Sequence, residues 1–557
     1  MGTERELAVA FVVARLSSSR LPAKQLRSVG GKPLLAWTVG ELRRCRELDR
    51  IVLATTADSS DDPLEGFARD AGIGCFRYAG DVNEVTTRLR RAAESEGAEI
   101  CVLVSGDCPL LDAALIDNAV ATLRRRPEAD YVAWRPAKQH AALEGVLVAR
   151  RRAWQLADDL ADRPELKEHQ FPVLYRRSEL FQTAVVDVPE ALCMPRHRWS
   201  VDTAADLEFF AVLHRELEAA GRPFTLREAV ACVKRRPELL ELNRHVRQRK
   251  VEDRALQVGF VIDAGGEYGY GHLSRCRELA WQLIERLSWS AEFLVDDEQA
   301  GRLLEEAGFR VRRGAVGRPS RLPAEVTETA AFVAECDFFV VDISDRRRLE
   351  PGWRGQFGKA PVVVIEQFAD WARESDLVVA PNVLGKGREA LGDWSGRVLE
   401  GPDYLILRRQ VLRAAAGGAA ERELDLFAYL HAAERAQALE NWARIAGVRL
   451  ATCTGWTDRF LDRLRQAWVF VSGFGVTFYE ALVLGAVPVC WPDSEAHRED
   501  AVRFYRWLGV EPLLMEQPSD LGAVLAKVRS DAFQLPRLSD GTPRIVAAFA
   551  ELAAART

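Results

Sequence analysis

The sequence predicts an α/β protein built from more than one doubly wound sheet, and three observations lead to this prediction. Its 557 residues exceed what one hydrophobic core usually holds. Short apolar runs rich in valine and isoleucine alternate with segments whose apolar residues recur at helical spacing. The alternation restarts at Leu256, after a charged stretch without a strand pattern. Strands that alternate with helices favour parallel sheets covered by helices on both faces.

Composition excludes several classes of protein. Apolar residues make up 48% of the chain and charged residues 28%, as in ordinary globular domains. No run approaches the roughly 20 apolar residues that cross a bilayer, so no membrane association is expected. The formal net charge of −6 gives no global basic surface for a nucleic-acid partner. The N-terminus has acidic residues before a short apolar run and no small-residue cleavage site, which predicts a first strand and a cytoplasmic protein.

The ten cysteines are scattered, and none forms a Cys-x-x-Cys pair. Most of them lie in apolar runs such as "EICVLVS" and "AVPVCW". We therefore expect buried, reduced thiols, and neither a disulfide framework nor a zinc site.

The first predicted domain covers residues 1–232. Its predicted strands are "LAVAFVVA", "RIVLATT", "IGCFRY", "EICVLVSG", "DYVAW" and "GVLVAR". Amphipathic segments such as "PLLAWTVGELRRC" separate them, as in a doubly wound sheet. The charged residues 233–256 that follow have a basic bias and no strand pattern. We expect a basic linker or connecting helix there, with a solvated helical face inside one domain as the alternative.

The second region begins with a strand, a glycine-rich turn and a helix in "LQVGFVIDAGGEYGYGHLSRCRELAWQLI". The later strand candidates are "AEFLV", "FRVRRG", "DFFVVDI", "PVVVIEQ", "DLVVAPN", "LDLFAYL", "VRLATC", "WVFVSG" and "AVPVCW". So many strands favour two sheets, over residues 257–412 and 424–557. The low-complexity stretch "RAAAGGAAERE" between them predicts a hinge.

Positive charge is concentrated directly after the first strand. The stretch "ARLSSSRLPAKQL" places Arg15, Arg20 and Lys24 within ten residues. Cations this close repel one another unless an anion lies among them, which points to a polyphosphate. The alternative is a solvated surface loop.

Two aspartates also follow predicted strands. Asp107 comes directly after "EICVLV", and Asp202 ends a short apolar segment before a helix. In an open α/β sheet, ligands sit outside the carboxyl ends of the strands. Two carboxylates there could hold Mg²⁺, completed by phosphate oxygens and water. Each aspartate by itself is more often a helix N-cap.

The segments "ARLSSSRLPAKQLRSVGGKPLLAWTV", "IVLATTADSSDDPLEGFARDAGI", "GDCPLLDAALID", "EHQFPVLYRR" and "RWSVDTAADLEFF" resemble cytidylyltransferases of the spore-coat-polysaccharide type, relatives of CMP-sialate and CMP-KDO synthetases. The resemblance runs from about residue 7 to about residue 215. It implies a Rossmann-like, GT-A-like nucleotidyltransferase fold and transfer of CMP from CTP to an acidic sugar. The implied site residues are Arg15, Ser18, Arg20 and Lys24 for the nucleotide, Asp107 and Asp202 for Mg²⁺, and Glu168, His169 and Arg198 for the sugar. A helix-surface role is the alternative for Glu168 and His169.

The glycine-rich turn of the second region is another candidate site. Asp263 ends its strand, and His272 follows the glycines at the start of a helix. Glycines let the backbone approach a ligand, and a helix N-terminus favours anions. A histidine beside a phosphate or sugar could accept a proton from water. The alternative is a helix-start histidine that only bonds to its own loop.

The segment "VSGFGVTFYEALVLGAVPVCW" repeats the order of strand, glycine turn and helix. Together with "DAGGEYGYGHLSRCRELA", "VVDISD", "DLVVAPN" and "GPDYLILRRQ", it resembles the UDP-sugar hydrolase of pseudaminic acid biosynthesis, a member of the GT-B superfamily. The resemblance implies a GT-B-like pair of Rossmann-like subdomains. The implied roles are His272 as the base that activates water, Asp263 as its orienting group or a sugar ligand, Asn382 facing the cleft, and Gly473, Gly475, Thr477 and Glu480 binding the nucleotide.

The sequence thus predicts a bifunctional enzyme of bacterial surface-sugar biosynthesis, of the nonulosonic acid type. One half would transfer CMP to an acidic sugar, and the other would hydrolyse a UDP-linked amino sugar. The expected partners are CTP, the acidic sugar and the UDP-sugar, with a homodimer left open. The alternatives are a cytidylyltransferase fused to a glycosyltransferase or to a non-catalytic module that binds nucleotide sugars.

Overall fold

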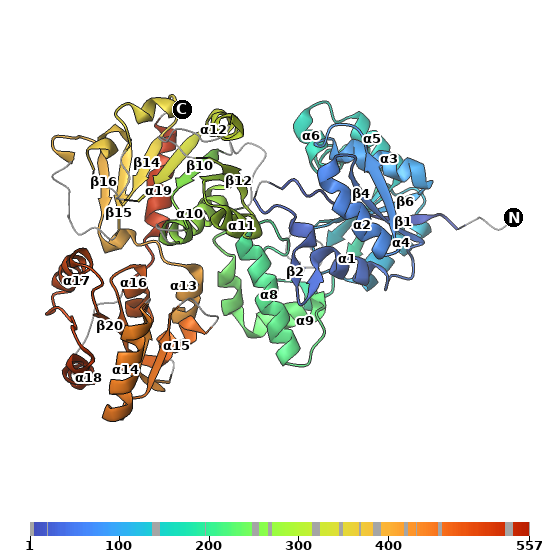
Figure 1. Cartoon of the computed structure of the whole chain (residues 1–557). Helices are drawn as coiled ribbons and strands as arrows, with labels where there is room; N and C mark the ends of the chain where they lie inside the picture. Colours follow the sequence, from blue (N-terminus) through green and yellow to red (C-terminus); the bar gives the residue numbers. More distant parts are fainter. Residues whose placement is uncertain are drawn as a thin grey trace. The chain divides into compact units, whose positions relative to one another are not determined.

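The computed structural model describes residues 5–18, 20–135, 145–194, 197–247, 256–265, 270–314, 323–344, 349–366, 369–381, 391–416, 421–430, 432–454, 459–529 and 538–555 (Figure 1). The chain divides into two compact units. Unit 1 comprises Met1–Arg254 with Ile284–Ser288, and unit 2 comprises Ala255–Leu283 with Trp289–Thr557. The division falls next to Leu256, where the strand and helix alternation restarts in the sequence.

Unit 1 contains a seven-stranded sheet in the order β5-β4-β1-β6-β8-β7-β9. The strands β5, β4, β1 and β6 are parallel, β8 is antiparallel to both of its neighbours, and β7 and β9 are parallel to each other. A separate antiparallel ribbon pairs β2 with β3. The bounds are β1 (Ala8–Val13), β2 (Ser28–Val29), β3 (Lys32–Pro33), β4 (Arg50–Thr56), β5 (Gly74–Tyr78), β6 (Ile100–Ser105), β7 (Tyr131–Arg135), β8 (Val146–Arg150) and β9 (Thr183–Asp187).

Strand β1 lies between two hydrophobic cores, because its successive side chains point to opposite faces of the sheet. Ala10 and Val12 join the core that contains residues of α1, α2, α4 and α8, whereas Val9 and Phe11 join the core formed with α3 and α5. Helices on both faces confirm the doubly wound arrangement of this sheet. The helices are α1 (Leu34–Leu42), α2 (Asp62–Asp70), α3 (Val85–Glu96), α4 (Ala113–Arg125), α5 (Arg151–Asp159), α6 (Pro164–Glu168), α7 (Val173–Arg176), α8 (Ala204–Ala219) and α9 (Leu226–Arg235).

The stretch expected to be a linker, residues 233–256, is partly folded into unit 1. Helix α9 continues to Arg235, and a 3₁₀ turn at Pro237–Leu242 follows it. Asn243 is buried, and its side-chain amide donates to the carboxylate of Asp206 on α8. The prediction of a linker was therefore wrong for the described part of this stretch, which contacts α8 through Asn243. The basic composition gave no indication of that contact.

Unit 2 contains two sheets, as the sequence predicted, and all of their strand pairs are parallel. The larger sheet has the order β12-β11-β10-β13-β14-β15-β16. Its strands are β10 (Gln257–Ile262), β11 (Ser290–Val295), β12 (Arg310–Arg313), β13 (Phe338–Asp342), β14 (Val362–Ile365), β15 (Leu377–Ala380) and β16 (Arg397–Glu400). The helices between them are α10 (Gly271–Leu287), α11 (Glu298–Glu306) and α12 (Pro323–Glu335).

The smaller sheet of unit 2 has the order β18-β17-β19-β20. Its strands are β17 (Leu424–Tyr429), β18 (Leu450–Cys453), β19 (Ala467–Ser472) and β20 (Val487–Cys490). The remaining helices are α13 (Arg409–Ala416), α14 (Ala433–Ala446), α15 (Phe460–Gln466), α16 (Val476–Val483), α17 (Glu495–Trp507), α18 (Leu521–Val528) and α19 (Thr542–Ala554). Part of the predicted hinge is thus helix α13.

The C-terminal helix α19 packs on the larger sheet, although the smaller sheet directly precedes it in sequence. The ring of Phe549 lies 5.1 Å from that of Phe338 in β13. The boundary at residue 424 therefore does not separate the two sheets completely, because the chain returns to the larger sheet after α18.

The ten cysteines are free, and seven of them are buried. Among the helices that the structure describes, none combines the length and the apolar composition needed to cross a membrane.

Trp154 on α5 tests the core between α3, α5 and β1. Its side chain is fully buried, with ring centroids 4.8 Å from Phe171 and 5.7 Å from Phe11. The substitution Trp154→Ala should lower the free energy of unfolding by about 3–5 kcal/mol, measured by urea denaturation, because it leaves a cavity. Leu156→Ala on the same helix is the control, since Leu156 is 41% exposed. Equal losses for both variants would contradict this packing.

Candidate functional site

A cavity of about 560 Å³ lies in unit 1 at the carboxyl ends of β1 and β6. The loop after β1, the first turns of α3, the segment after β6 and the end of α6 line it. Ligands of open α/β sheets bind at this edge, where loops and helix N-termini converge. The residues predicted for nucleotide and metal binding in the first domain all line this cavity: Arg15, Ser18, Arg20, Lys24, Asp107 and Asp202.

The Lys24 ammonium lies between the two predicted metal ligands. Its Nζ atom is 2.6 Å from Oδ2 of Asp107 and 2.7 Å from Oδ1 of Asp202. Burial by itself would lower the pKa of Lys24, but the two carboxylates outweigh it and raise that pKa above its ordinary value. The cationic loop and both aspartates therefore share one hollow, as the sequence predicted.

Hydrogen bonds hold both the side chain and the backbone carbonyl of Asp107. Ser105 at the end of β6 donates its hydroxyl to Oδ1 of Asp107 at 2.6 Å. The backbone N–H of Val201 donates to the carbonyl of Asp107 at 2.8 Å, which ties together the two segments that carry the aspartates. A Cβ atom on Gly106 would lie 2.9 Å from the carbonyl oxygen of Val13, so a glycine is needed where β1 and β6 end.

Asp202 is surrounded by cations. Arg20 lies 3.0 Å and Arg198 2.5 Å from its carboxylate oxygens, in addition to Lys24. Burial by itself would raise the pKa of Asp202, but these three cations outweigh it and hold that pKa well below its usual range. Arg198, which the sequence predicted to bind the sugar, thus forms an ion pair with Asp202. The N-cap of α8 is Thr203, which forms a capping box with Asp206, so Asp202 is not the helix cap.

Arg15 and Ser18 lie in the loop that leaves β1. The Arg15 guanidinium donates to Oδ1 of Asn83 at 3.0 Å, and the Ser18 hydroxyl accepts from the backbone N–H of Leu21 at 3.4 Å. The buried carboxylate of Asp61 fixes the loop by accepting the backbone N–H of Leu16 at 2.7 Å. The loop is therefore held by the protein, while its charged side chains line the cavity.

The predicted sugar ligands Glu168 and His169 lie at the end of α6 and line the same cavity, where both are exposed. Sequence reasoning missed Arg88, a fully buried residue in the first turn of α3 that also lines it. The signal for Arg88 was an arginine in the first turn of the helix that follows β5. Asn382, predicted for the second site, is outside the residues that the structure describes.

Carboxylate oxygens such as those of Asp107 and Asp202 are the hard ligands that Mg²⁺ prefers, and the Lys24 ammonium lies at the position that they share. Oδ2 of Asp107 and Oδ1 of Asp202 both contact the Lys24 ammonium. The two carboxylate oxygens therefore face the same point in the cavity. Among the described residues, no group of three or more His, Cys, Asp or Glu side chains forms a metal cluster. Two carboxylates completed by phosphate oxygens and water would be the type of site that Mg²⁺ uses.

In unit 2, His272 at the start of α10 bonds to a buried carboxylate. Its Nδ1 atom lies 2.7 Å from Oδ1 of Asp342, the last residue of β13. Arg275 donates from Nε and NH2 to the two oxygens of Asp342, both at 2.6 Å. Burial by itself would raise the pKa of Asp342, but Arg275 and His272 outweigh it and hold that pKa well below its usual range. Asp342 is thus ionised and completely buried.

The sequence predicted Asp263 either as the group that orients His272 or as a sugar ligand, and the structure gives the contact with His272 to another carboxylate. Asp263 is buried, and its Oδ2 atom accepts the backbone N–H of Ser344 at 3.0 Å. In the described part of the chain, the carboxylate bonded to the His272 ring is Asp342. The signal for Asp342 was present in "VVDISD", because β13 pairs directly with β10 and ends at the same edge of the sheet.

The second glycine turn precedes α16 in the smaller sheet. Gly473, Gly475 and Thr477 lie where β19 ends and α16 begins. Glu480 is fully buried, and Arg408 donates to both of its carboxylate oxygens. Burial outweighs Arg408 and raises the pKa of Glu480 above its usual value. The Glu480 carboxylate, predicted to bind the nucleotide, is therefore paired with Arg408 inside the protein.

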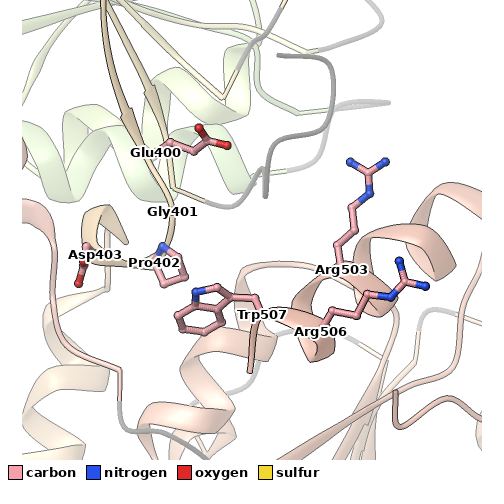
Figure 2. A pocket seen from close by; sticks show the side chains of 7 residues that line it. All are labelled: Glu400, Gly401, Pro402, Asp403, Arg503, Arg506 and Trp507. Atoms are coloured by element: carbon pink, nitrogen blue, oxygen red, sulfur yellow. The ribbon is translucent and has the colours of Figure 1, made fainter. Parts of the chain in front are cut away.

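A further cavity in unit 2, of about 640 Å³, contains none of the predicted site residues (Figure 2). Acidic side chains from the end of β16 and the turn after it line this cavity together with arginines and a tryptophan of α17. Asp403 there is paired with Arg544 at 2.8 Å.

Asp342→Asn tests the buried ion pairs of unit 2. Near neutral pH it should lower the free energy of unfolding by about 3–5 kcal/mol, because buried Arg275 loses the carboxylate that accepts from its Nε and NH2 and keeps only its ion pair with Glu366. The folded pKa is lowered, so this stabilisation is complete above the unfolded pKa of about 3.9 and is lost as the pH falls below it. Urea denaturation should therefore show a smaller difference between wild type and variant at about pH 3.

The control is Asp337→Asn, which removes an exposed carboxylate just before the other end of β13. A difference between wild type and Asp342→Asn that stays constant on acidification would show that the carboxylate is not the source of the stability.

Comparison with known proteins gives a family for unit 1. Residues 9–213 match the family model described as "Cytidylyltransferase". The spore coat polysaccharide biosynthesis protein SpsF of Bacillus subtilis (strain 168) is 26% identical over 239 residues, covering 41% of this chain and 95% of SpsF. The 3-deoxy-manno-octulosonate cytidylyltransferase of Geobacter sulfurreducens is 36% identical over 118 residues, covering 21% of this chain and 46% of that protein.

Among solved structures, MurG of Acinetobacter baumannii covers 53% of this chain and 99% of its own chain at 11% identity, with a TM-score of 0.35. A score this low does not establish a shared fold, and the predicted GT-B relationship of unit 2 stays a prediction. The N-terminal region, by contrast, is a cytidylyltransferase-type nucleotidyltransferase domain of mixed α/β structure.

Proposed function

We propose that unit 1 transfers CMP from CTP to an acidic sugar in the biosynthesis of a bacterial surface polysaccharide. The observation that carries this proposal is the Lys24 ammonium held between Asp107 and Asp202, in a cavity that Arg15 and Arg20 also line. The family match and the names of the two relatives support the nucleotide and the class of sugar. Glu168 and His169, which line the same cavity and are exposed there, would contact the sugar.

The reaction needs positioning and charge neutralisation more than a dedicated base. The anomeric hydroxyl of the sugar attacks the α-phosphorus, the bond from that phosphorus to the bridging oxygen breaks, and pyrophosphate leaves with the electron pair. The hydroxyl proton passes to solvent. Arg15 would neutralise the charge that grows on the leaving phosphates. Arg20 and Lys24 would do the same once they exchange their carboxylate partners for phosphate oxygens. Asp107 and Asp202 would hold Mg²⁺, which when bound neutralises phosphate oxygens as a Lewis acid.

The variants Lys24→Met and Asp107→Asn test this site. Each should lower kcat/KM for pyrophosphate release from CTP and an acidic sugar by about 100-fold or more, because one charge of the centre is lost. The control Asp187→Asn removes a carboxylate that is 67% exposed on β9 and should leave the rate unchanged. If wild type releases no pyrophosphate with any nonulosonic acid or KDO, in the presence of Mg²⁺, the proposal for unit 1 is wrong.

For unit 2 we propose hydrolysis of a UDP-linked amino sugar, and the His272–Asp342 pair favours this second function. The Nδ1 atom of His272 lies 2.7 Å from Oδ1 of Asp342 and 2.8 Å from NH2 of Arg275. In the tautomer whose Nδ1–H donates to Asp342, the Nε2 lone pair would take a proton from water. The water oxygen would bond to the anomeric carbon while the bond from that carbon to the phosphate oxygen breaks, and UDP leaves. Gly473, Gly475 and Thr477 would receive the diphosphate at the start of α16.

The activity of unit 2 is tested by UDP release from UDP-acetamidosugars. His272→Ala should reduce it by about 100-fold or more, as for other general bases. Asp342→Asn should also reduce kcat, and Asp337→Asn is the control. UDP release that requires an added acceptor sugar would instead indicate a glycosyltransferase. UDP-sugar binding without any release would indicate a non-catalytic module.

A further inference from the structure

We propose that Arg88 is a further ligand-binding residue of unit 1 and that its guanidinium, together with that of Arg15, binds the β- and γ-phosphates of CTP, the part that leaves as pyrophosphate. This inference rests on the proposed CTP-dependent function and adds a residue to its site. Arg88 lies in the first turn of α3, and it is only 1% exposed while it lines the cavity.

The Arg88 guanidinium is incompletely bonded. NH2 donates to the carbonyl oxygen of Val82 at 2.9 Å. Nε and NH1 are buried and have no hydrogen-bond partner among the residues that the structure describes. A buried charged donor without a partner is costly, and such groups in native proteins are usually satisfied by a protein group, water or a ligand.

A second arginine lies beside it. NH1 of Arg15 donates to the same carbonyl of Val82 at 3.4 Å, so the two guanidiniums converge on one backbone oxygen. Burial and the charge of Arg15 lower the pKa of Arg88 to about 10, which still leaves it charged at neutral pH. In addition, the first turn of a helix carries a positive partial charge, so α3 does not compensate for either cation.

No ion pair joins Arg15 or Arg88 to a carboxylate in the described ranges of the chain. Asp61 is close enough to act on the pKa of Arg88, but its oxygens already accept the Leu16 N–H at 2.7 Å and the hydroxyls of Thr55 and Thr56 at 3.0 and 2.5 Å. The two guanidiniums therefore offer several donors to an oxyanion in the cavity.

Arg150 is a buried arginine of the same domain that lies outside the cavity lining, and it serves as a comparison for the hydrogen bonding of Arg88. It is 5% exposed, yet Nε donates to the carbonyl of Ala129 at 3.0 Å, NH2 donates to that of Leu123 at 2.7 Å, and NH1 bonds to Glu6. All of its nitrogens have partners. Arg88 differs in that two of its nitrogens are left for a ligand.

Adjacent phosphates suit this pair best, because two guanidiniums can bond several oxygens of one diphosphate group. The carboxylate of the acidic sugar is the other oxyanion in the reaction. The two possible ligands of Arg88 predict different results. If Arg88 binds phosphates, its loss should weaken nucleotide binding more as the number of phosphates rises. If Arg88 binds the sugar carboxylate, its loss should change only the KM for the sugar.

The test is isothermal titration of wild type, Arg88→Lys and Arg88→Met with CMP, CDP, CTP and inorganic pyrophosphate. Arg88→Met should weaken CTP and pyrophosphate binding roughly 10- to 100-fold and leave CMP binding nearly unchanged. Arg88→Lys should recover part of the CTP affinity, because it restores the charge without the planar donors. The KM for the sugar should not change.

Arg150→Met is the matched control: it should lower thermal stability and keep the wild-type ratio of CTP to CMP affinity. The inference is overturned if Arg88→Met keeps that ratio as well, or if only the KM for the sugar rises, which would assign Arg88 to the carboxylate. Should Arg88→Met not fold, an unchanged ratio in Arg88→Lys overturns it equally. Failure of wild type to bind any cytidine nucleotide would instead refute the proposed function of unit 1, and the two failures are thus distinguishable.

Discussion

The ion pairs that join Lys24 to Asp107 and Asp202 hold the site of unit 1 together. Lys24 is separated from these aspartates by 83 and 178 positions in the sequence. Because the three groups are partly shielded from water, their attraction is stronger than that of a surface pair, and loss of one partner would leave a buried charge. This interaction therefore fixes the loop after β1, the end of β6 and the segment before α8 relative to one another.

The charges of the cavity fall into two groups that differ physically. Around Asp202, three cations (Arg20, Lys24 and Arg198) and three carboxylates (Asp107, Asp202 and Asp206) largely compensate one another within the protein. Around Arg15 and Arg88, the described residues supply backbone and amide oxygens but no ion pair. The first group accounts for the shape of the site. The second retains uncompensated positive charge, and this is the property that a polyanionic substrate requires.

The two units solve the problem of placing a carboxylate in the same way. Asp107 follows β6, the neighbour of β1, and Asp342 ends β13, the neighbour of β10. In each unit the carboxylate meets a cation from the segment after the first strand, Lys24 in one and Arg275 in the other. Parallel strands bring their carboxyl ends to one edge of a sheet, so side chains distant in sequence meet there.

The sequence by itself determined the strands that are buried on both faces, the two regions of the chain, and the cationic loop with its two aspartates. Those features depend on local composition and periodicity. It did not reveal β9 or β16, since these edge strands are short and half exposed. Only the tertiary structure decided that Asp342, and not Asp263, contacts His272. It also decided that Arg408 pairs with Glu480. Finally, it placed Arg88 at the cavity with two nitrogens that have no hydrogen-bond partner among the described residues. The reason is that such pairings depend on which strands and helices become neighbours. The pattern of a single sequence does not specify which side chains of neighbouring elements come within bonding distance.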